Sequence, residues 1–309
     1  MNINRNTIFK NFSWLKDKNK FFIISADYDG LICASFLHHY LGWTLVGYYN
    51  MENIWISQQG LDNKKELIWV DLNIVPGLGK SVGGQIANLD NNLPEGLNSS
   101  CNLNIINNVT YKKFKNKFPF STLIFLLWLY NIKVKSTLMS KLFILHSDSS
   151  WVKMQRYNKN ANDWINLLSD YNWDNLLYNI DSIDYEKAID QKLYPYLMNI
   201  GASTGFSKLK SKHLNIQTRE CRFNPDWDED IILNLFRLFG NKLKWTPPPI
   251  PKLIHRIDGN RQKIPLSKVK KLGLSTFLKE NNIFCYAIPS PSIFNYTSFS
   301  SVKSPVELS

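Results

Sequence analysis

The chain has 309 residues, of which 44% are hydrophobic and 14% aromatic, and its formal net charge at pH 7 is +12. This apolar content excludes global disorder, and the length allows two domains or one large domain with an appendage. The excess of Lys and Arg favours a polyanionic partner, although a solvated basic surface would give the same balance.

Cysteine usage and the apolar runs bear on the compartment. The four cysteines, at positions 33, 101, 221 and 285, form no CxxC pair. This spacing argues against a zinc site or a disulfide framework and favours a reducing cytoplasm. The first twenty residues lack a continuous apolar segment, and the longest apolar run, 119–130, is too short to cross a bilayer. We therefore expect a cytoplasmic protein that does not associate with membranes.

The N-terminal half alternates short apolar strands with helices, as parallel α/β sheets do. We expect helices at 31–41 and 119–132, and strands at 21–26, 43–49, 67–72, 85–89 and 141–146. The predicted fold class is α/β, with a mostly parallel sheet, flanking helices and a smaller helical and mixed C-terminal region.

Aspartates follow several of these predicted strands. Asp27 and Asp29 come after the first strand, and Asp71, Asp90 and Asp148 come after later ones. In open α/β sheets the carboxyl ends of the strands form the ligand-binding edge. Because carboxylates are hard oxygen ligands, this convergence predicts a site for Mn²⁺ or Mg²⁺. The alternative for Asp27 and Asp29 is a turn with a helix N-cap, where Asp is also favoured.

The second half of the chain is predicted to be more helical. Amphipathic helices are expected over 151–200, and an acidic start predicts a helix at 225–240 that Gly240 ends. The prolines at 245–252 predict a stiff linker, and the Ser-rich end from 297 onward is expected to be a loose tail. We divide the chain into two parts. Residues 1–178 are the predicted α/β domain that contains the aspartates, and residues 179–309 are a helical and basic C-terminal region with the linker at 245–252.

A basic segment follows the proline linker. Basic tracks interleaved with aromatic residues are typical of proteins that bind single-stranded nucleic acid. We expect phosphate contacts from its cations, namely Arg256, Arg261, Lys263, Lys268, Lys270 and Lys271. Exposed aromatic residues and the proline-rich linker also suit a protein partner.

The aspartate motifs resemble those of the DHH phosphoesterase superfamily, which includes RecJ-like exonucleases. ISADYDGLICASFL is similar to its first motif, LIWVDLNI to its second, and LFILHSDSSW to its fourth, which also contains His146. QIANLDNN stands where the family has Asp-His-His, so Asn91 and Asn92 replace the two histidines. The resemblance implies a metal site formed by Asp27, Asp29, Asp71 and Asp148, with Asp90 assisting.

Two functional hypotheses follow from this resemblance. The leading one is a Mn²⁺- or Mg²⁺-dependent phosphoesterase, a nuclease that acts on single-stranded nucleic acid. The alternative is a non-enzymatic nucleic-acid-binding or scaffolding subunit, which the two asparagines favour because a carboxamide is a poor ligand for Mn²⁺. A HAD-type phosphatase is a third and weaker possibility, because DYDG resembles Asp-x-Asp-Gly, but Leu31 follows where that family has Thr or Val.

Overall fold

The computed structural model describes residues 3–90, 92, 95–203 and 205–300. Its contacts divide the chain into two compact units that are interleaved along the sequence. Unit 1 contains 26–40 and 119–248 together with the first residues of the chain, and unit 2 contains 5–25, 41–118 and the chain from 249 onward. The division expected at residue 178 falls inside unit 1.

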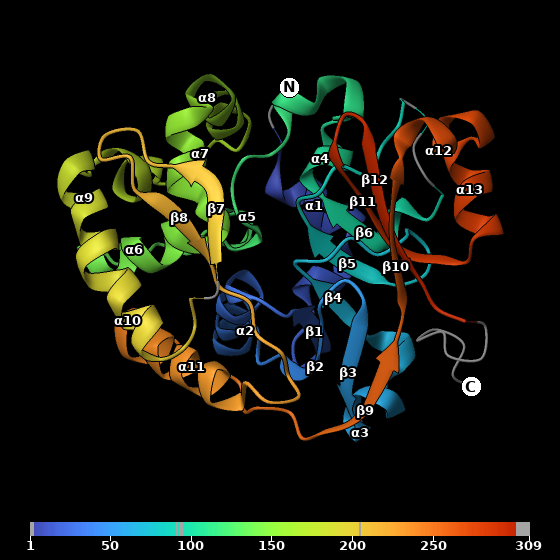
Figure 1. Cartoon of the computed structure of the whole chain (residues 1–309), viewed down its shortest axis with the longest axis horizontal. Helices are drawn as coiled ribbons and strands as arrows, with labels where there is room; N and C mark the ends of the chain where they lie inside the picture. Colours follow the sequence, from blue (N-terminus) through green and yellow to red (C-terminus); the bar gives the residue numbers. More distant parts are fainter. Residues whose placement is uncertain (1–2, 91, 93–94, 204, 301–309) are drawn as a thin grey trace. The chain divides into compact units, whose positions relative to one another are not determined.

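Unit 2 contains a seven-stranded, mostly parallel sheet, which confirms the predicted fold class (Figure 1). β1 lies near its centre and pairs in parallel with β2 and β4, and the parallel ladder continues through β5 to β6. β3 and β9 extend the other edge in antiparallel pairing. The order is β6 (Ser100–Asn102), β5 (Lys80–Gly83), β4 (Ile68–Val70), β1 (Phe21–Ser25), β2 (Thr44–Tyr49), β3 (Asn53–Ser57) and β9 (Leu253–Asp258).

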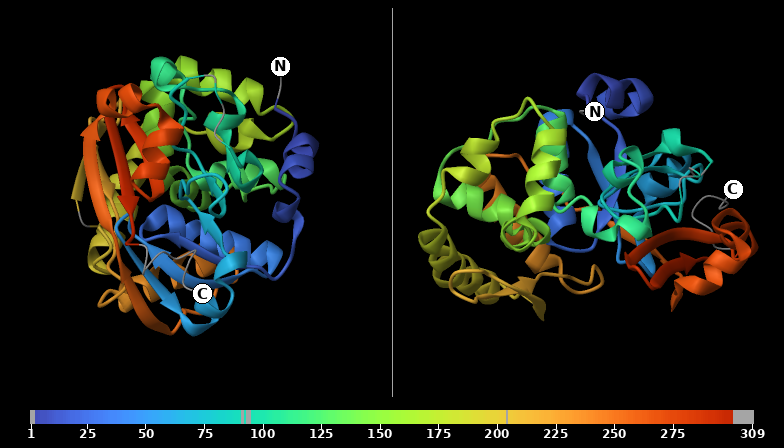
Figure 2. Two further views of the ribbon diagram at one scale, coloured as in Figure 1. Left: turned by 90° about the vertical axis from the view of Figure 1, so that its right-hand side faces the viewer. Right: turned by 90° about the horizontal axis from the view of Figure 1, so that it is seen from above.

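A small antiparallel sheet completes unit 2. Its order is β10 (Asn260–Pro265), β12 (Ile293–Ser298) and β11 (Ile283–Ser290), and α12 (Leu266–Leu272) and α13 (Leu274–Glu280) lie against it (Figure 2). Phe284 and Phe299 pack into the same core as Ile23 and Trp69, so the C-terminal strands share one hydrophobic core with the large sheet. The other α-helices of unit 2 are α1 (Arg5–Asn11), α3 (Gln58–Asp62) and α4 (Leu103–Ile106).

Unit 1 is mainly helical, with one hairpin of β7 (Gly205–Lys210) and β8 (Gln217–Glu220). Local sequence explains several helix starts, since the hydroxyls of Ser121 and Thr137 accept bonds from backbone N–H groups in the first turns of their helices. The helices are α2 (Tyr28–Leu41, of which the last residue is counted in unit 2), α5 (Thr122–Leu129), α6 (Leu138–His146), α7 (Ser150–Arg156), α8 (Asn158–Leu167), α9 (Ser182–Ala188), α10 (Tyr194–Asn199) and α11 (Glu229–Leu243).

Three predictions about these elements were wrong. The segment 141–146 is the end of α6 rather than a strand, because the cap at Thr137 starts a helix and a short apolar run fits either structure. Residues 85–89 form only an isolated bridge between Asn88 and Thr110, and the strand lies earlier, at β5. Gly240 does not end α11, which continues to Leu243 and ends at Lys244 in a left-handed conformation.

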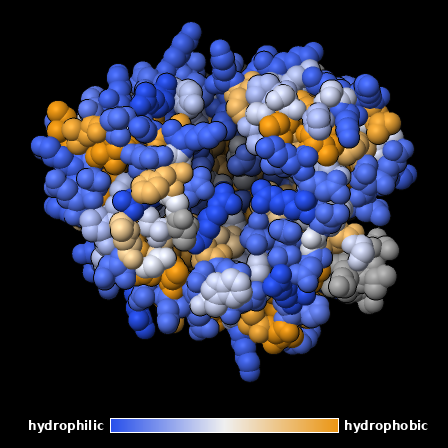
Figure 3. Space-filling model, in the orientation of Figure 1, coloured by the Kyte–Doolittle hydropathy of each residue, from blue (hydrophilic) through white to orange (hydrophobic). Residues whose placement is uncertain are grey.

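The visible surface is largely hydrophilic, with apolar residues in separate small patches (Figure 3). Among the described residues, no helix combines the length and the apolar character needed to cross a lipid bilayer. The predicted tail lies mostly in 301–309, outside the described residues; its first residues, 297 and 298, belong to β12.

Candidate functional site

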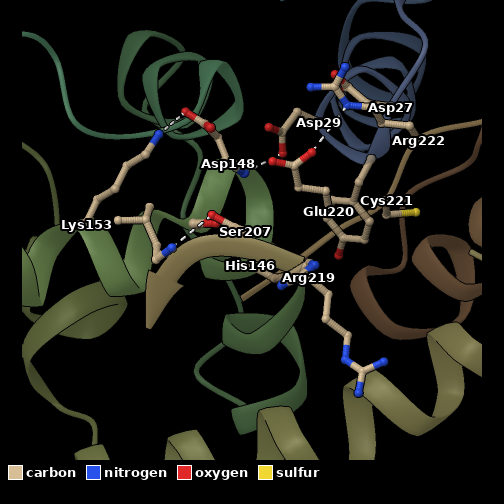
Figure 4. Close-up of a pocket in the computed structure, with 13 residues that line it drawn as sticks. Asp27, Asp29, His146, Asp148, Lys153, Ser207, Arg219, Glu220, Cys221 and Arg222 are labelled. Carbon is tan, nitrogen blue, oxygen red and sulfur yellow. Dashed lines mark hydrogen bonds and ion pairs between the residues drawn. The ribbon is translucent and has the colours of Figure 1, made fainter. Parts of the chain in front are cut away.

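Unit 1 contains a pocket of about 170 Å³ that brings together acidic and basic side chains (Figure 4). Its carboxylates come from the start of α2, from the turn after α6 and from β8, and its cations come from α7 and from the segment 219–222. The charged lining residues are Asp27, Asp29, Asp148, Glu220, Lys153, Arg219 and Arg222. Three of the aspartates predicted from the sequence therefore meet in one cavity.

Asp27 lies directly before α2 and caps it. Its Oδ1 accepts a hydrogen bond from the backbone N–H of Gly30 at 3.0 Å, so the N-cap alternative is confirmed for this residue. A backbone bridge to Arg222 and the bond from the Tyr28 N–H to the Cys221 carbonyl, at 2.9 Å, hold this junction against the segment that follows β8. The half-buried Asp27 carboxylate is thus fixed at the pocket wall.

Asp29 is held by the turn after α6. Its Oδ1 accepts from the Ser147 hydroxyl at 2.5 Å and from the backbone N–H of Asp148 at 2.6 Å. The turn achieves this through two successive left-handed residues, Asp148 with φ 47° and Ser149 with φ 55°. A non-glycine residue in this region is uncommon, although Asp tolerates it better than most. The strained turn therefore orients Asp29.

The other charged side chains of the pocket each have an identified interaction partner. The Asp148 carboxylate forms a short ion pair with Lys153. Arg222 lies 3.6 Å from the Glu220 carboxylate. Arg219 has its guanidinium carbon 5.1 Å from the ring centroid of Tyr194. The acidic groups and the cations thus share one cavity.

The neutral side chains of the pocket are kept neutral by burial. Burial lowers the pKa of His146 to about 4, so its imidazole is uncharged at pH 7. Burial, reinforced by the Asp27 and Asp29 carboxylates, raises the pKa of the Cys221 thiol. Burial also raises the pKa of Tyr28, whose ring packs edge-on against His146 at 4.9 Å. These groups are therefore an uncharged wall beside the carboxylates.

Asp71 belongs to unit 2, where it follows β4 as predicted. It has a left-handed backbone with φ 59°, and its Oδ2 accepts from the hydroxyl of Ser25, the last residue of β1, at 2.8 Å. Asp90 also lies in unit 2, and its Oδ1 accepts from the backbone N–H of Asn92 at 2.8 Å. Asn91 lies outside the described residues.

The basic segment predicted to bind nucleic acid forms parts of β9, β10 and α12 in unit 2. Arg256 is paired with Asp258 at 2.7 Å and lies over the ring of Trp55, and Lys270 lies 3.9 Å from the ring centroid of Tyr111. The other four predicted cations are exposed on β10 and α12, namely Arg261, Lys263, Lys268 and Lys271. This segment therefore offers a basic surface of its own.

Sequence reasoning missed the cations of the unit 1 pocket. Arg219 and Arg222 lie about 190 residues after Asp27, and Lys153 lies within a predicted amphipathic helix. The sequence around the two arginines, TRECRF, matches no known functional motif. The arginines are recognised as pocket residues only in the structure, where 221–223 pair in antiparallel fashion with 26–28. Ser147 could have been found more easily than these cations, since it directly precedes the predicted site residue Asp148.

Comparison of this chain with protein-family models, curated proteins and solved structures finds no match.

Proposed function

We propose that this chain is a DHH-like, metal-dependent phosphoesterase that acts on single-stranded nucleic acid. The observation that carries the proposal is the unit 1 pocket, where the half-buried carboxylates of Asp27 and Asp29 share a cavity with Lys153, Arg219 and Arg222. Carboxylates bind a hard cation, and Lys and Arg bind the phosphate that is to be hydrolysed. A pocket for a neutral substrate would need neither the carboxylates nor the cations.

The donor chemistry fits Mn²⁺ or Mg²⁺. The N–H and O–H bonds received by Asp27 and Asp29 fix the orientation of the two carboxylates, and each carboxylate has two oxygens with several acceptor positions. A bound cation would lower the pKa of a coordinated water and shield the phosphate charge. Lys153 and Arg222 would hold the phosphodiester against the carboxylate wall.

The family resemblance implies Asp71 as a further metal ligand, and in unit 2 its carboxylate accepts a hydrogen bond from the hydroxyl of Ser25. Asp148 is included as a ligand that would exchange its ion pair with Lys153 for the cation. Asp90 retains only the assisting role that the family resemblance implies.

The test is hydrolysis of single-stranded DNA and RNA oligonucleotides with Mn²⁺ or Mg²⁺. We expect D27N/D29N to lose cleavage by at least about 100-fold, because two of the proposed ligands in the pocket lose their negative charge. D163N is the matched control, since Asp163 is exposed on α8 in the same unit. Direct Mn²⁺ titration by electron paramagnetic resonance provides a second readout, and D27N/D29N should bind the ion more weakly than D163N.

Removing the two charges should leave the melting temperature unchanged or raised, because crowded carboxylates repel each other in the metal-free protein. Equal cleavage by D27N/D29N and D163N would exclude this pocket as the catalytic site.

One observation favours a second candidate, a non-enzymatic nucleic-acid-binding subunit. Asp27 caps α2 and Asp29 holds the 147–149 turn, so both carboxylates have structural roles that need no metal. For this candidate, the wild-type protein would bind oligonucleotides but neither bind Mn²⁺ nor cleave. The four cysteines are buried and form no disulfide, which supports the cytoplasmic location that we propose for either function.

A further inference from the structure

The β7–β8 hairpin of unit 1 has two chemically different faces. Ser207 and Leu209 of β7 line the pocket. The alternating residues Phe206, Lys208 and Lys210 are exposed on the other face, as expected when successive side chains of a strand point to opposite sides. Phe206 is 63% exposed, which is unusual for a residue of its size. One strand therefore both closes the pocket and presents an aromatic ring with two lysines.

Phe206 is held in place by Arg219, its direct partner across the hairpin. The Arg219 guanidinium carbon lies 4.8 Å from the Phe206 ring centroid and 5.1 Å from that of Tyr194, so the cation is packed between two rings. Its Nη1 donates to the sulfur of Met198 at 2.8 Å, and within the described part of the chain Arg219 takes part in no ion pair. The exposed ring thus rests on a positive charge that no carboxylate balances.

The exposed side chains of β7 suit a polyanion. Phe206, Lys208 and Lys210 present one aromatic ring and two cations to solvent, although the register of β7 against β8 shifts between Phe206 and Lys210. An exposed aromatic ring stacks on an unpaired base, whereas the bases of a duplex are already stacked on each other.

We infer that the exposed face of β7 is a binding track for single-stranded nucleic acid, in which Phe206 stacks on a base and Lys208 and Lys210 contact phosphates. The inference rests on the proposed function for the class of polymer and adds the surface that recognises it. It lies in unit 1, on the hairpin that lines the pocket, and shares no residue with the basic segment of β9, β10 and α12. Arg219 is a positioning residue that supports the Phe206 ring.

The experiment is a fluorescence-anisotropy titration of a labelled 12-nucleotide single strand with the full chain, in EDTA, at several salt concentrations. The variants are F206L and K208Q/K210Q. K187Q/K192Q is the matched control, because it removes the same charge from two exposed lysines of the same unit, Lys187 in the last turn of α9 and Lys192 between α9 and α10. A second oligonucleotide carries abasic sites and therefore has phosphates but no bases to stack.

We expect F206L to weaken binding of the normal strand about fivefold or more, and to leave binding of the abasic strand nearly unchanged. K208Q/K210Q should flatten the slope of log affinity against log salt by about 1.4 with both strands, since each single-strand phosphate contact contributes about 0.7. K187Q/K192Q should have the wild-type slope. Identical affinities and slopes for all variants would overturn the track, as would wild-type protein that does not bind at low salt.

Failure of the track and failure of the enzyme proposal are distinguishable, because binding is measured without a divalent cation. If cleavage depends on Asp27 and Asp29, but F206L and K208Q/K210Q bind the strand as the wild type does, the proposed function stands and the binding track is refuted. A protein that never cleaves but shows the expected losses of binding retains the track. If heparin binds as tightly as the oligonucleotide and F206L has no effect on either, base stacking is refuted.

Discussion

His146 shows at the level of one residue how burial fixes the protonation state in the pocket. Its ring packs edge-on against Tyr28 and Tyr194, and its pKa is lowered to about 4 from an ordinary value near 6.5. Between pH 6.5 and pH 4 the unfolded chain binds a proton at His146 that the folded chain does not. The contribution of this residue to stability is therefore fully present above pH 6.5 and falls as the pH is lowered, by about 3 kcal/mol in total.

H146F should remove this component of the pH dependence, because Phe keeps a ring between the two tyrosines and does not titrate. We expect the difference in unfolding free energy between H146F and wild type to shift by about 3 kcal/mol in favour of H146F from pH 7 to pH 4. Urea denaturation at pH 7, 5.5 and 4 measures this difference. Parallel pH profiles for the two proteins would show that folded His146 protonates normally.

At the same scale, the sequence predicts part of the site. Asp27 and Asp29 are recognisable because a run of β-prone residues ends in a turn that only certain residues favour. Their partners are not recognisable in the same way, since Arg219 and Arg222 reach the pocket through the pairing of 221–223 with 26–28. Local propensity carries no information about such distant pairing.

Among the elements, α11 ends at a left-handed residue that is not glycine. Lys244 adopts φ 62° as the C-terminal cap, and its N–H donates to the Gly240 carbonyl at 3.1 Å. Glycine is the usual residue in this conformation because other side chains are strained there. Gly240 lies inside the helix, and a Cβ there would make only ordinary contacts, the nearest at 3.4 Å from the carbonyl oxygen of Trp245.

K244G should therefore stabilise the protein by about 0.5–1 kcal/mol, by relieving the left-handed strain. K242G, two residues earlier and inside the last turn, should destabilise it by about 1 kcal/mol, because glycine is unfavourable in a helix interior. Thermal and urea unfolding of the two variants measure both effects. A K244G variant less stable than wild type would mean that the Lys244 side chain makes a compensating contact.

The segment KLFILH shows why some elements could not be assigned. Its apolar run is as short as a strand, yet it forms the end of α6 because the cap lies earlier, at Thr137 and Ser140. Asp148 was predicted from this mistaken strand and nevertheless lines the pocket, since a helix end and a strand end both place a polar turn at the edge of the core. The pocket position of Asp148 was therefore predicted correctly from a strand that is in fact a helix.

For the whole molecule, the net charge of +12 requires surfaces that meet a polyanion or solvent. Lys268 and Lys271 lie three residues apart on α12, while Leu266 and Val269 of the same helix are buried. The two lysines therefore share an exposed face. Unlike Lys270, which lies over Tyr111, they are not packed against an aromatic ring of the described chain.

K268Q/K271Q should flatten the salt dependence of single-strand binding by about 1.4, with little change in sequence preference. K10Q/K65Q, which neutralises two exposed lysines elsewhere in unit 2, is the control and should keep the wild-type slope. Salt titrations with DNA and RNA strands measure both. Equal slopes for the two double variants would make α12 a solvated or protein-docking face.

The fold class followed from the alternation of apolar strands and helices in the first half, but the interleaving of the two units did not. β9 is short and rich in charge, and its pattern does not reveal that it joins the large sheet beside β3. Strand pairing across some 200 residues depends on register and on which edge remains open, and neither is encoded locally.

The pairing of β3 with β9 also has a kinetic consequence. β3 is complete at Ser57, but its outer edge is covered only when residues 253–258 are available, after the whole of 119–248 has been synthesised. This arrangement gives the sheet a high contact order and leaves a hydrophobic strand with an open edge during translation. The chain is therefore expected to fold late and slowly in unit 2, and nascent or truncated chains that end before β9 are its most aggregation-prone species.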